Sequence, residues 1–263
     1  MMRYAVLLEY DGGGFVGWQR QENGLGVQEA LETALLRLTG EPIVVQAAGR
    51  TDAGVHAAGQ VANFDLSRPW EPRRIVHGLN HHLRPHRVAV LAAERVPPDF
   101  SARFSALSRH YRYQILTREA PAILRLGRVW WLPRELELEP MREAAALLLG
   151  THDFTSFRAA QCQARSPIKS LTELAIDREA CDGGLGSLVT VTAAAPSFLH
   201  HQVRNMVGSL VQVGLRRWPV ARMAEALHAR DRSQAGETAP PQGLCLMRVQ
   251  YPVLMFGGSD STQ

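Results

Sequence analysis

Lysine is almost absent from this chain: Lys169 is the only one, so 28 of the 29 basic residues are arginines. The arginine guanidinium binds phosphates through two hydrogen bonds and stacks on bases, which suits RNA, although a compositional bias of the genome produces the same excess of arginine. Cys162, Cys181 and Cys245 are widely spaced and include no Cys-x-x-Cys pair. They therefore predict neither a disulfide framework nor a zinc site, and we expect a cytoplasmic protein.

Long apolar runs are also missing. No stretch approaches the roughly 18 residues that a membrane span needs. The first ten residues have no small-residue cleavage site and soon turn acidic, so we interpret them as a strand and not as a signal peptide. The sequence thus predicts no membrane partner.

Positive charge is unevenly distributed. Residues 1–50 hold four arginines against six acids, whereas residues 101–134 hold seven arginines against one acid. Phe104, Tyr111 and Tyr113 lie among these arginines, which favours nucleic acid over a membrane as the polyanionic partner. The alternative is an arginine-rich face that is only solvated.

The same order of predicted elements occurs twice along the chain. Hydrophobic periodicity predicts, in the first half, a strand at 3–10, a helix at 26–39, strands at 42–48 and 59–65, a helix at 72–83 and a strand at 87–96. The second half has a predicted strand at 107–117, a helix at 139–149, strands at 168–177 and 186–195, helices at 199–216 and 219–229, and a strand at 244–251.

Each half matches the ferredoxin-like β-α-β-β-α-β pattern. We therefore predict an α+β fold of two ferredoxin-like units, joined into one extended mixed, mainly antiparallel sheet with a central RNA-binding cleft. Residues 1–105 form the expected N-terminal domain, with a linker from Pro97 to Ser105, and residues 106–252 form the C-terminal domain. We expect residues 253–263 to be a disordered tail.

Asp52 is the strongest candidate for a catalytic residue. It lies in Gly49-Arg50-Thr51-Asp52-Ala53-Gly54-Val55-His56, a turn between two predicted strands where backbone can approach a ligand closely. Arg50 is a nearby cation that favours the ionised carboxylate. An ionised, positioned aspartate can act as nucleophile or base, and the alternative is a surface aspartate in a hairpin turn.

A glycine pattern and two histidine pairs resemble a nucleotide-binding site and metal sites, but their context fits neither kind of site. Gly12-x-Gly14-x-x-Gly17 has the letters of a dinucleotide fingerprint, but the next predicted helix begins only near residue 26, so a loop that contacts single-stranded RNA fits better. His81-His82 and His200-His201 are each placed on a predicted helix, where adjacent side chains point about 100° apart. We therefore expect no metal site.

Tyr111 and Arg204 are two further candidate residues. Tyr111 shares a strand face with Arg109 and Tyr113, where it could stack on a base, transfer a proton or pack in the sheet. Arg204 lies at the margin of an apolar helix stripe, where an arginine usually pairs with a carboxylate. Asp52 is the candidate partner.

Four motifs occur in the order found in one family. Residues 48–57 around Asp52, 109–113 (Arg-His-Tyr-Arg-Tyr), 153–158 (Asp-Phe-Thr-Ser-Phe-Arg) and 200–208 (His-His-Gln-Val-Arg-Asn-Met-Val-Gly) resemble motifs of the tRNA pseudouridine synthase A family. The resemblance extends from the first strand to about residue 252. It implies an isomerase that converts uridine to pseudouridine at positions 38, 39 and 40 of the tRNA anticodon stem-loop, as a homodimer without metal or organic cofactor.

The resemblance also implies residue roles. Asp52 would be the nucleophile, Tyr111 the ring stacked on uracil and a possible base, Arg204 the partner of Asp52, and Arg50 the residue that fills the space of the flipped base. The residues expected to contact RNA are Arg103, Phe104, Gln161, Gln163 and Arg165.

Some questions stay open at this point. The sequence does not decide whether Asp52 attacks C1′ or deprotonates C2′ to form a glycal, or which residue removes the C5 proton. Two other functions compete with the isomerase: a tandem RNA-binding protein without catalytic activity, which leaves Asp52 unexplained, and a nucleotide-dependent oxidoreductase, which rests on the glycines at 12–17 alone.

Overall fold

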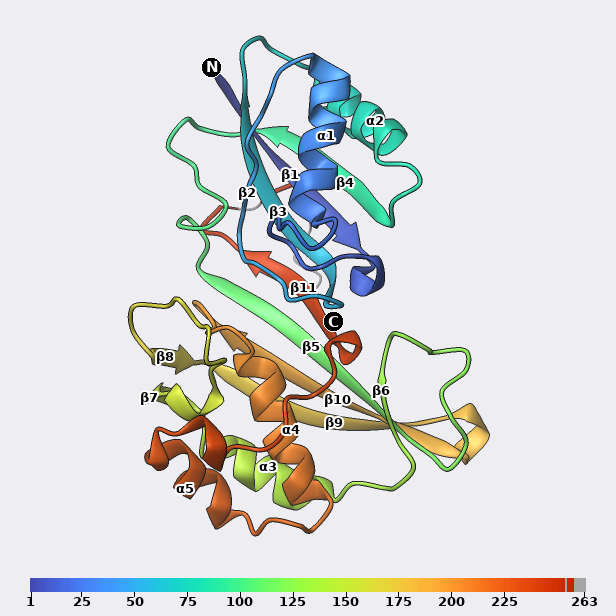
Figure 1. The fold of residues 1–263 in the computed structure, drawn as a ribbon, viewed down its shortest axis with the longest axis vertical. Coiled ribbons are helices and arrows are strands. Elements are labelled where there is room, and N and C mark those ends of the chain that lie inside the picture. Colours follow the sequence, from blue (N-terminus) through green and yellow to red (C-terminus); the bar gives the residue numbers. More distant parts are fainter. Residues whose placement is uncertain (254, 258–263) are drawn as a thin grey trace. The chain divides into compact units, whose positions relative to one another are not determined.

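The computed structural model of the chain describes residues 1–253 and 255–257. It forms two compact units (Figure 1). Unit 1 contains Met1–Arg109 together with the described residues from Leu246 on, and unit 2 contains His110–Cys245. Both units combine helices with mainly antiparallel strands, so the α+β class is confirmed.

Unit 1 is built around its first strand, β1 (Met2–Tyr10). It lies between β3 (His56–Leu66) and β4 (Val88–Arg95) and pairs with both in antiparallel register. Helices α1 (Val27–Thr39) and α2 (Pro72–His82) pack against each other, and α2 also packs on β4. This order reproduces the predicted β-α-β-β-α-β unit, and α1 ends where Gly40 adopts the left-handed conformation.

The second strand of unit 1 is much shorter than predicted. Of the expected strand 42–48, β2 (Gln46–Ala47) pairs with β3 and the Ala48 N–H donates to the Val61 carbonyl at 2.8 Å, whereas the Val45 N–H donates to Glu32 Oε1 at 3.1 Å. Another strand, β11 (Leu244–Gln250), also neighbours β3, and a Cβ on Gly59 would lie 2.3 Å from the Met247 carbonyl oxygen. β2 and β11 thus share the same edge of β3, so only a short part of that edge can pair with β2.

Unit 2 has a central strand β10 (Gly186–Ala195) between β5 (Ser108–Thr117) and β9 (Glu173–Cys181), and β10 pairs with β9 in antiparallel register. A short strand, β6, pairs with β5 in parallel. Helix α3 packs on α4 and β9, and β7 pairs with β8 in a separate two-stranded sheet. The bounds of these elements are β6 Trp130–Leu132, α3 Leu138–Ala146, β7 Gly150–Asp153, β8 Ile168–Leu171, α4 Gln202–Gly214 and α5 Ala221–Ala229.

Single turns of 3-10 helix connect several of these elements. They are η1 Gly12–Gly14, η2 Thr155–Phe157, η3 Asp182–Gly184, η4 Arg232–Gln234 and η5 Pro241–Gly243. No helix among residues 1–253 and 255–257 is both long and apolar enough to cross a bilayer.

Three details differ from the sequence predictions. The strand expected at 168–177 is divided at Thr172 into β8 and β9, and β6 and β7 were not predicted. Helix α4 begins at Gln202 and not at 199, because His201 has a left-handed φ of 64° that a helix cannot contain. The His200-His201 pair therefore precedes the helix, and the prediction that both lie on a helix is wrong.

The division of the chain falls close to the proposed linker, at Arg109 and not at 105. The last strand, expected in the C-terminal domain, belongs to unit 1 from Leu246 on. Of the expected tail, residues 254 and 258–263 lie outside the described residues. Phe256 packs on a small apolar cluster of unit 1, and its N–H donates to Glu94 Oε2 at 2.8 Å.

Candidate active site

The turn that carries Asp52 is supported by a second piece of backbone. We call residues 49–56 the Asp52 turn and residues 11–18 the glycine segment. Asp52 forms an isolated antiparallel bridge with Gly17, and the Trp18 N–H donates to the Thr51 carbonyl at 3.0 Å. Within the turn, the Val55 N–H donates to the Asp52 carbonyl at 3.1 Å. The backbone on both sides of the carboxylate is therefore fixed.

Glycine is needed where the two segments touch. A Cβ at Gly12 would lie 2.1 Å from the Val55 carbonyl oxygen, and one at Gly17 would lie 2.8 Å from the Thr51 carbonyl oxygen. Gly17 also has a φ of +115°, which disfavours any other residue. Because α1 begins only at Val27, these glycines do not open an α-helix as in a dinucleotide fingerprint. They allow close packing beneath Asp52.

A buried side-chain network, Tyr10–Thr51–Gln60, holds the start of the turn. The Tyr10 hydroxyl is hydrogen-bonded to Thr51 Oγ1 at 2.8 Å, and Gln60 Nε2 donates to the Gly49 carbonyl at 2.8 Å and to the Tyr10 hydroxyl at 3.4 Å. Gln60 is fully buried and Tyr10 is 4% exposed. These buried hydrogen bonds favour one conformation of the turn, although Gln60 Oε1 accepts none of them.

The end of the turn is held by His56, which is also buried. The Gly12 N–H donates to His56 Nδ1 at 3.0 Å, and Asp11 Oδ1 lies 3.1 Å from the same nitrogen. Asp11 in turn pairs with Arg87 at 3.0 Å. The Asp52 turn is thus attached at both ends, while Asp52 itself is half-buried and Arg50 is exposed.

Arg103 and Phe104 lie in unit 1, in a compact loop at 100–106. Phe104 is 81% exposed, and the Arg103 guanidinium carbon lies 5.2 Å from the centre of its ring. Ala102 fixes the loop from behind, since its N–H donates to Asn63 Oδ1 at 2.8 Å and its carbonyl accepts from the Tyr251 hydroxyl at 2.7 Å. Burial raises the pKa of Tyr251, with the Arg109 charge opposing that shift, so its phenol keeps this proton.

Arg109 connects this loop to Ala48, the residue that precedes the Asp52 turn. Its Nη2 donates to the Ala48 carbonyl at 2.7 Å and to the Arg103 carbonyl, and its Nε also donates to Ala48 at 3.2 Å. The side chain is 8% exposed. The sequence placed Arg109 beside Tyr111 but gave no sign of this connection.

Tyr111 lies in unit 2 and is 8% exposed. Its ring meets Phe198 edge-on, with centroids 5.3 Å apart and planes at 87°. The neighbouring Tyr113 has a structural role: its hydroxyl donates to the Pro240 carbonyl at 2.7 Å, and burial raises its pKa, with Arg204 opposing and Glu237 adding to that shift.

Arg204 is at the margin of the buried face of α4, as predicted. Its Nε donates to the Ala239 carbonyl at 2.8 Å, and the Ala239 N–H donates to the Arg204 carbonyl at 3.2 Å. One turn later, Gly208 lets the chain near Glu237 approach, since a Cβ there would lie 1.8 Å from the Glu237 carbonyl oxygen. The segment 237–239 therefore fixes the guanidinium position.

The candidate residues are thus divided between the units. Arg50, Asp52, Arg103 and Phe104 belong to unit 1, and Tyr111, Gln161, Gln163, Arg165 and Arg204 belong to unit 2. Gln161, Gln163 and Arg165 are all exposed, in the segment between η2 and β8.

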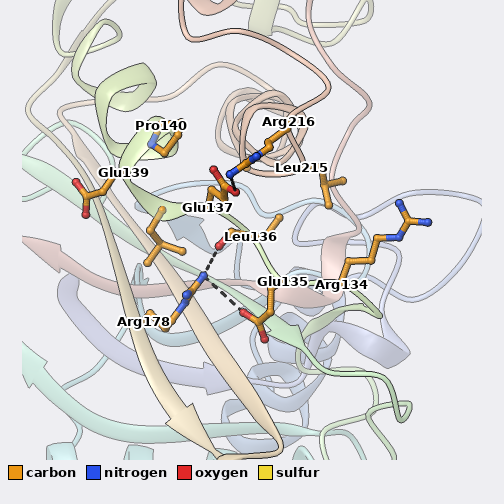
Figure 2. A pocket seen from close by; sticks show the side chains of 11 residues that line it. Arg134, Glu135, Leu136, Glu137, Glu139, Pro140, Arg178, Leu215 and Arg216 are labelled. Atoms are coloured by element: carbon orange, nitrogen blue, oxygen red, sulfur yellow. Dashed lines mark hydrogen bonds and ion pairs between the residues drawn. The ribbon is translucent and has the colours of Figure 1, made fainter.

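A separate hollow in unit 2 does not contain these residues. It has a volume of about 530 Å³ and is lined by residues 134–140, Arg178 and residues 214–216 (Figure 2). Most of its charged side chains are paired: Arg178 contacts Glu135 at 3.6 Å and donates to the Leu136 carbonyl, Arg216 pairs with Glu137, and Glu139 pairs with Arg142. We therefore do not assign the candidate active site to this hollow.

Comparison with known proteins identifies related sequences. A profile of the family described as tRNA pseudouridine synthase matches residues 6–105 and 144–252. Proteins named tRNA pseudouridine synthase A are 56% identical in Acidiphilium cryptum, over 97% of this chain and 99% of the relative, and 52% identical in Beijerinckia indica, over 96% and 95%. The relative from Rhodospirillum rubrum is 54% identical over 96% of this chain and 88% of its own length.

Proposed function

The chain belongs to the tRNA pseudouridine synthase family and is an isomerase that acts on tRNA; on that premise we propose that Asp52 isomerises uridines 38, 39 and 40 of the anticodon stem-loop. The observation that carries the proposal is the fixed Asp52 turn. Its backbone is held by Gly17 and Trp18, and its ends are held by Gln60 and His56. A half-buried carboxylate on an immobile backbone is suited to catalysis at one atom.

The reaction requires few groups. The bond from N1 of uracil to C1′ breaks, the base turns over, a bond from C5 to C1′ forms, the C5 proton leaves to a base, and N1 takes up a proton from water. An ionised Asp52 could attack C1′ to form a covalent intermediate, or deprotonate C2′ to form a glycal. Both routes place the carboxylate beside the ribose, so the fixed turn supports either one.

The target nucleotide must first leave its stem, at a cost of a few kcal/mol. We propose that Tyr111 stacks on the flipped uracil, a contact that contributes about 1–3 kcal/mol. The edge-on contact with Phe198 supports this role because it fixes the plane of the Tyr111 ring. Tyr111 is also a candidate base for the C5 proton.

Arg204 and Arg50 complete the proposed site. We propose that Arg204 pairs with Asp52 and keeps it ionised, which is supported by the Ala239 carbonyl that holds its Nε. We propose that Arg50, which is exposed, occupies the space that the flipped base leaves. Arg103, Phe104, Gln161, Gln163 and Arg165 are the proposed contacts to the rest of the RNA.

The assembly and location are also proposals. We propose a cytoplasmic homodimer that needs neither metal nor organic cofactor. Light scattering of the purified protein tests the dimer, and activity after treatment with a chelator tests the absence of a metal requirement.

Nucleotide mapping tests the substrate positions. Purified protein is incubated with transcribed tRNAs that each carry one uridine at position 38, 39 or 40, and pseudouridine is located by its chemical adducts. We expect modification at each of the three positions, and a tRNA with uridines only elsewhere as the control should stay unmodified. Pseudouridine outside these positions would contradict the proposed specificity.

A further inference from the structure

Helix α2 of unit 1 has a strongly basic outer face. Its buried side consists of Ile75 and Leu79, which are at most 1% exposed, and Leu83 just after the helix continues it. The opposite side carries only basic groups among its exposed charges. We call this set the α2 stripe, and its members are Arg73, Arg74, His77, His81 and Arg84, all of them exposed.

The stripe differs from the outer faces of α1 and α3. Residues 72–87 include no aspartate or glutamate, and the acid nearest in sequence is Glu71, which lies 3.8 Å from Arg74. The outer faces of α1 and α3 instead carry charges of both signs, Glu29 with Arg37 and Glu139 with Arg142. A helix face that is only solvated has no need to exclude acids.

The arginines at the start of α2 are also placed against the local electrostatics. Arg73 and Arg74 lie in its first turn, where the partial positive charge of the helix N-terminus repels cations. Sequence choices that contradict local stability are concentrated at functional surfaces. The stripe is therefore better explained by a polyanionic ligand than by the stability of the helix.

The helix is rigidly held, and the end of the stripe leads to the Asp52 turn. Asn80 exchanges two hydrogen bonds of 2.8 Å with the Val90 backbone and so fixes α2 to β4. After Arg84, the His86 ring lies 6.4 Å from Phe15 of the glycine segment, and Arg87 pairs with Asp11. The basic surface is thus continuous, within unit 1, with the segment that supports Asp52.

We propose that the α2 stripe, together with His86 and Arg87, binds the phosphate backbone of tRNA outside the nucleotide that reacts. Successive side chains four residues apart, such as Arg73, His77 and His81, are separated by roughly 6 Å along the helix. Contacts of this kind position a nucleic acid without reading its sequence. The inference rests on the proposed function only in that tRNA is the substrate, because it does not involve Asp52.

The test compares salt dependence of tRNA binding between two double variants. Arg73→Ala/Arg74→Ala removes two cations of the stripe. Its helix N-terminus loses two repelled charges and, in exchange, only the exposed Arg74–Glu71 pair, so we expect the variant to fold. Arg37→Ala/Arg95→Ala removes two exposed arginines of unit 1 that lie outside the stripe. The dissociation constant for intact tRNA is measured between 50 and 200 mM salt, and turnover is measured at saturating tRNA.

Each lost phosphate contact lowers the slope of log K against log salt by about 0.7–0.9. For the stripe variant we therefore expect a slope smaller by about 1.4–1.8, so that the fourfold rise in salt weakens its binding about 7- to 12-fold less than that of the parent. At 50 mM salt its dissociation constant should be higher, with turnover at saturation unchanged. The control variant should keep the parental slope.

The proposal would be overturned if the stripe variant kept the parental salt slope and the parental affinity for tRNA. An equal change in the control variant would also overturn it, because the total charge of the protein would then explain the effect. Asp52→Asn is measured in parallel. If it stayed active, the proposed catalytic function would fail while the salt result would still decide the role of the stripe.

Discussion

Substitution of Gly17 by alanine offers a direct way to disturb Asp52 without touching its side chain. The new Cβ would lie 2.8 Å from the Thr51 carbonyl oxygen and 3.3 Å from the Asp52 carbonyl carbon. Ordinary contact begins near 3.4 Å, so the turn has to move by about 0.6 Å, the difference between these distances. Because a misplacement of about 1 Å can cost about 100-fold in rate, we expect kcat to fall about 10- to 100-fold.

Gly40→Ala is the matched control. Gly40 also has a positive φ, +78°, but no atom lies within 4 Å of the place that a Cβ would take there, and it ends α1. Both variants should lose about 1–2 kcal/mol of unfolding free energy from backbone strain, and Gly17→Ala should lose more because of the clash. Turnover of C5-tritiated tRNA and thermal unfolding are measured for both. Parental kcat in a folded Gly17→Ala protein would refute the claim that the glycine segment positions Asp52.

Three further predictions concern the supports of unit 1. Tyr10→Phe removes the hydroxyl that contacts Thr51, so it should lower the unfolding free energy by about 1 kcal/mol. It should also lower kcat several-fold with KM unchanged, and a change in KM alone would contradict the role of Tyr10 in holding the turn. Arg109→Ala leaves the Ala48 and Arg103 carbonyls without this donor, so it should weaken tRNA binding and lower kcat. Arg109→Lys should restore neither property, because a single ammonium lacks the planar set of donors of the guanidinium, and full rescue by lysine would contradict this explanation. Asp65 has a lowered pKa because Arg3 donates to it, so the ion pair stabilises the fold above about pH 4 and is lost as pH falls below that value. Asp65→Asn, measured by urea unfolding, should therefore be about 0.5–1 kcal/mol less stable than the parent at pH 7 and should approach it near pH 3, whereas a difference independent of pH would contradict the assignment.

Helices and long strands could be predicted because their signals are local. The apolar 3–4 spacing of α1 and its terminal Gly40 are both visible in the sequence, as is the alternation that becomes β5. The start of α4 could not be predicted, because a left-handed His201 has no sequence signal of its own. The length of β2 depends on β11, a strand about 200 residues later in the chain, which competes for the edge of β3.

The candidate site divides in the same way. Asp52 could be identified from its glycine-flanked motif, and Tyr111 and Arg204 from their places on a strand and a helix. The supports of the turn could not, since Gln60 and Arg109 resemble ordinary polar residues of strands until tertiary contacts place them beneath Gly49 and Ala48. Gly12 and Gly17 match a dinucleotide pattern in the sequence, but the close packing of two backbone segments explains them.

The central claim is that Asp52 performs the isomerisation. Its most direct test is the release of tritium from C5-labelled uridine in tRNA by Asp52→Asn, with the exposed Asp99→Asn as the same chemical change outside the turn. We predict that Asp52→Asn binds tRNA but releases no label above background, and that Asp99→Asn releases it at the parental rate. Release by Asp52→Asn at the parental rate would contradict the account.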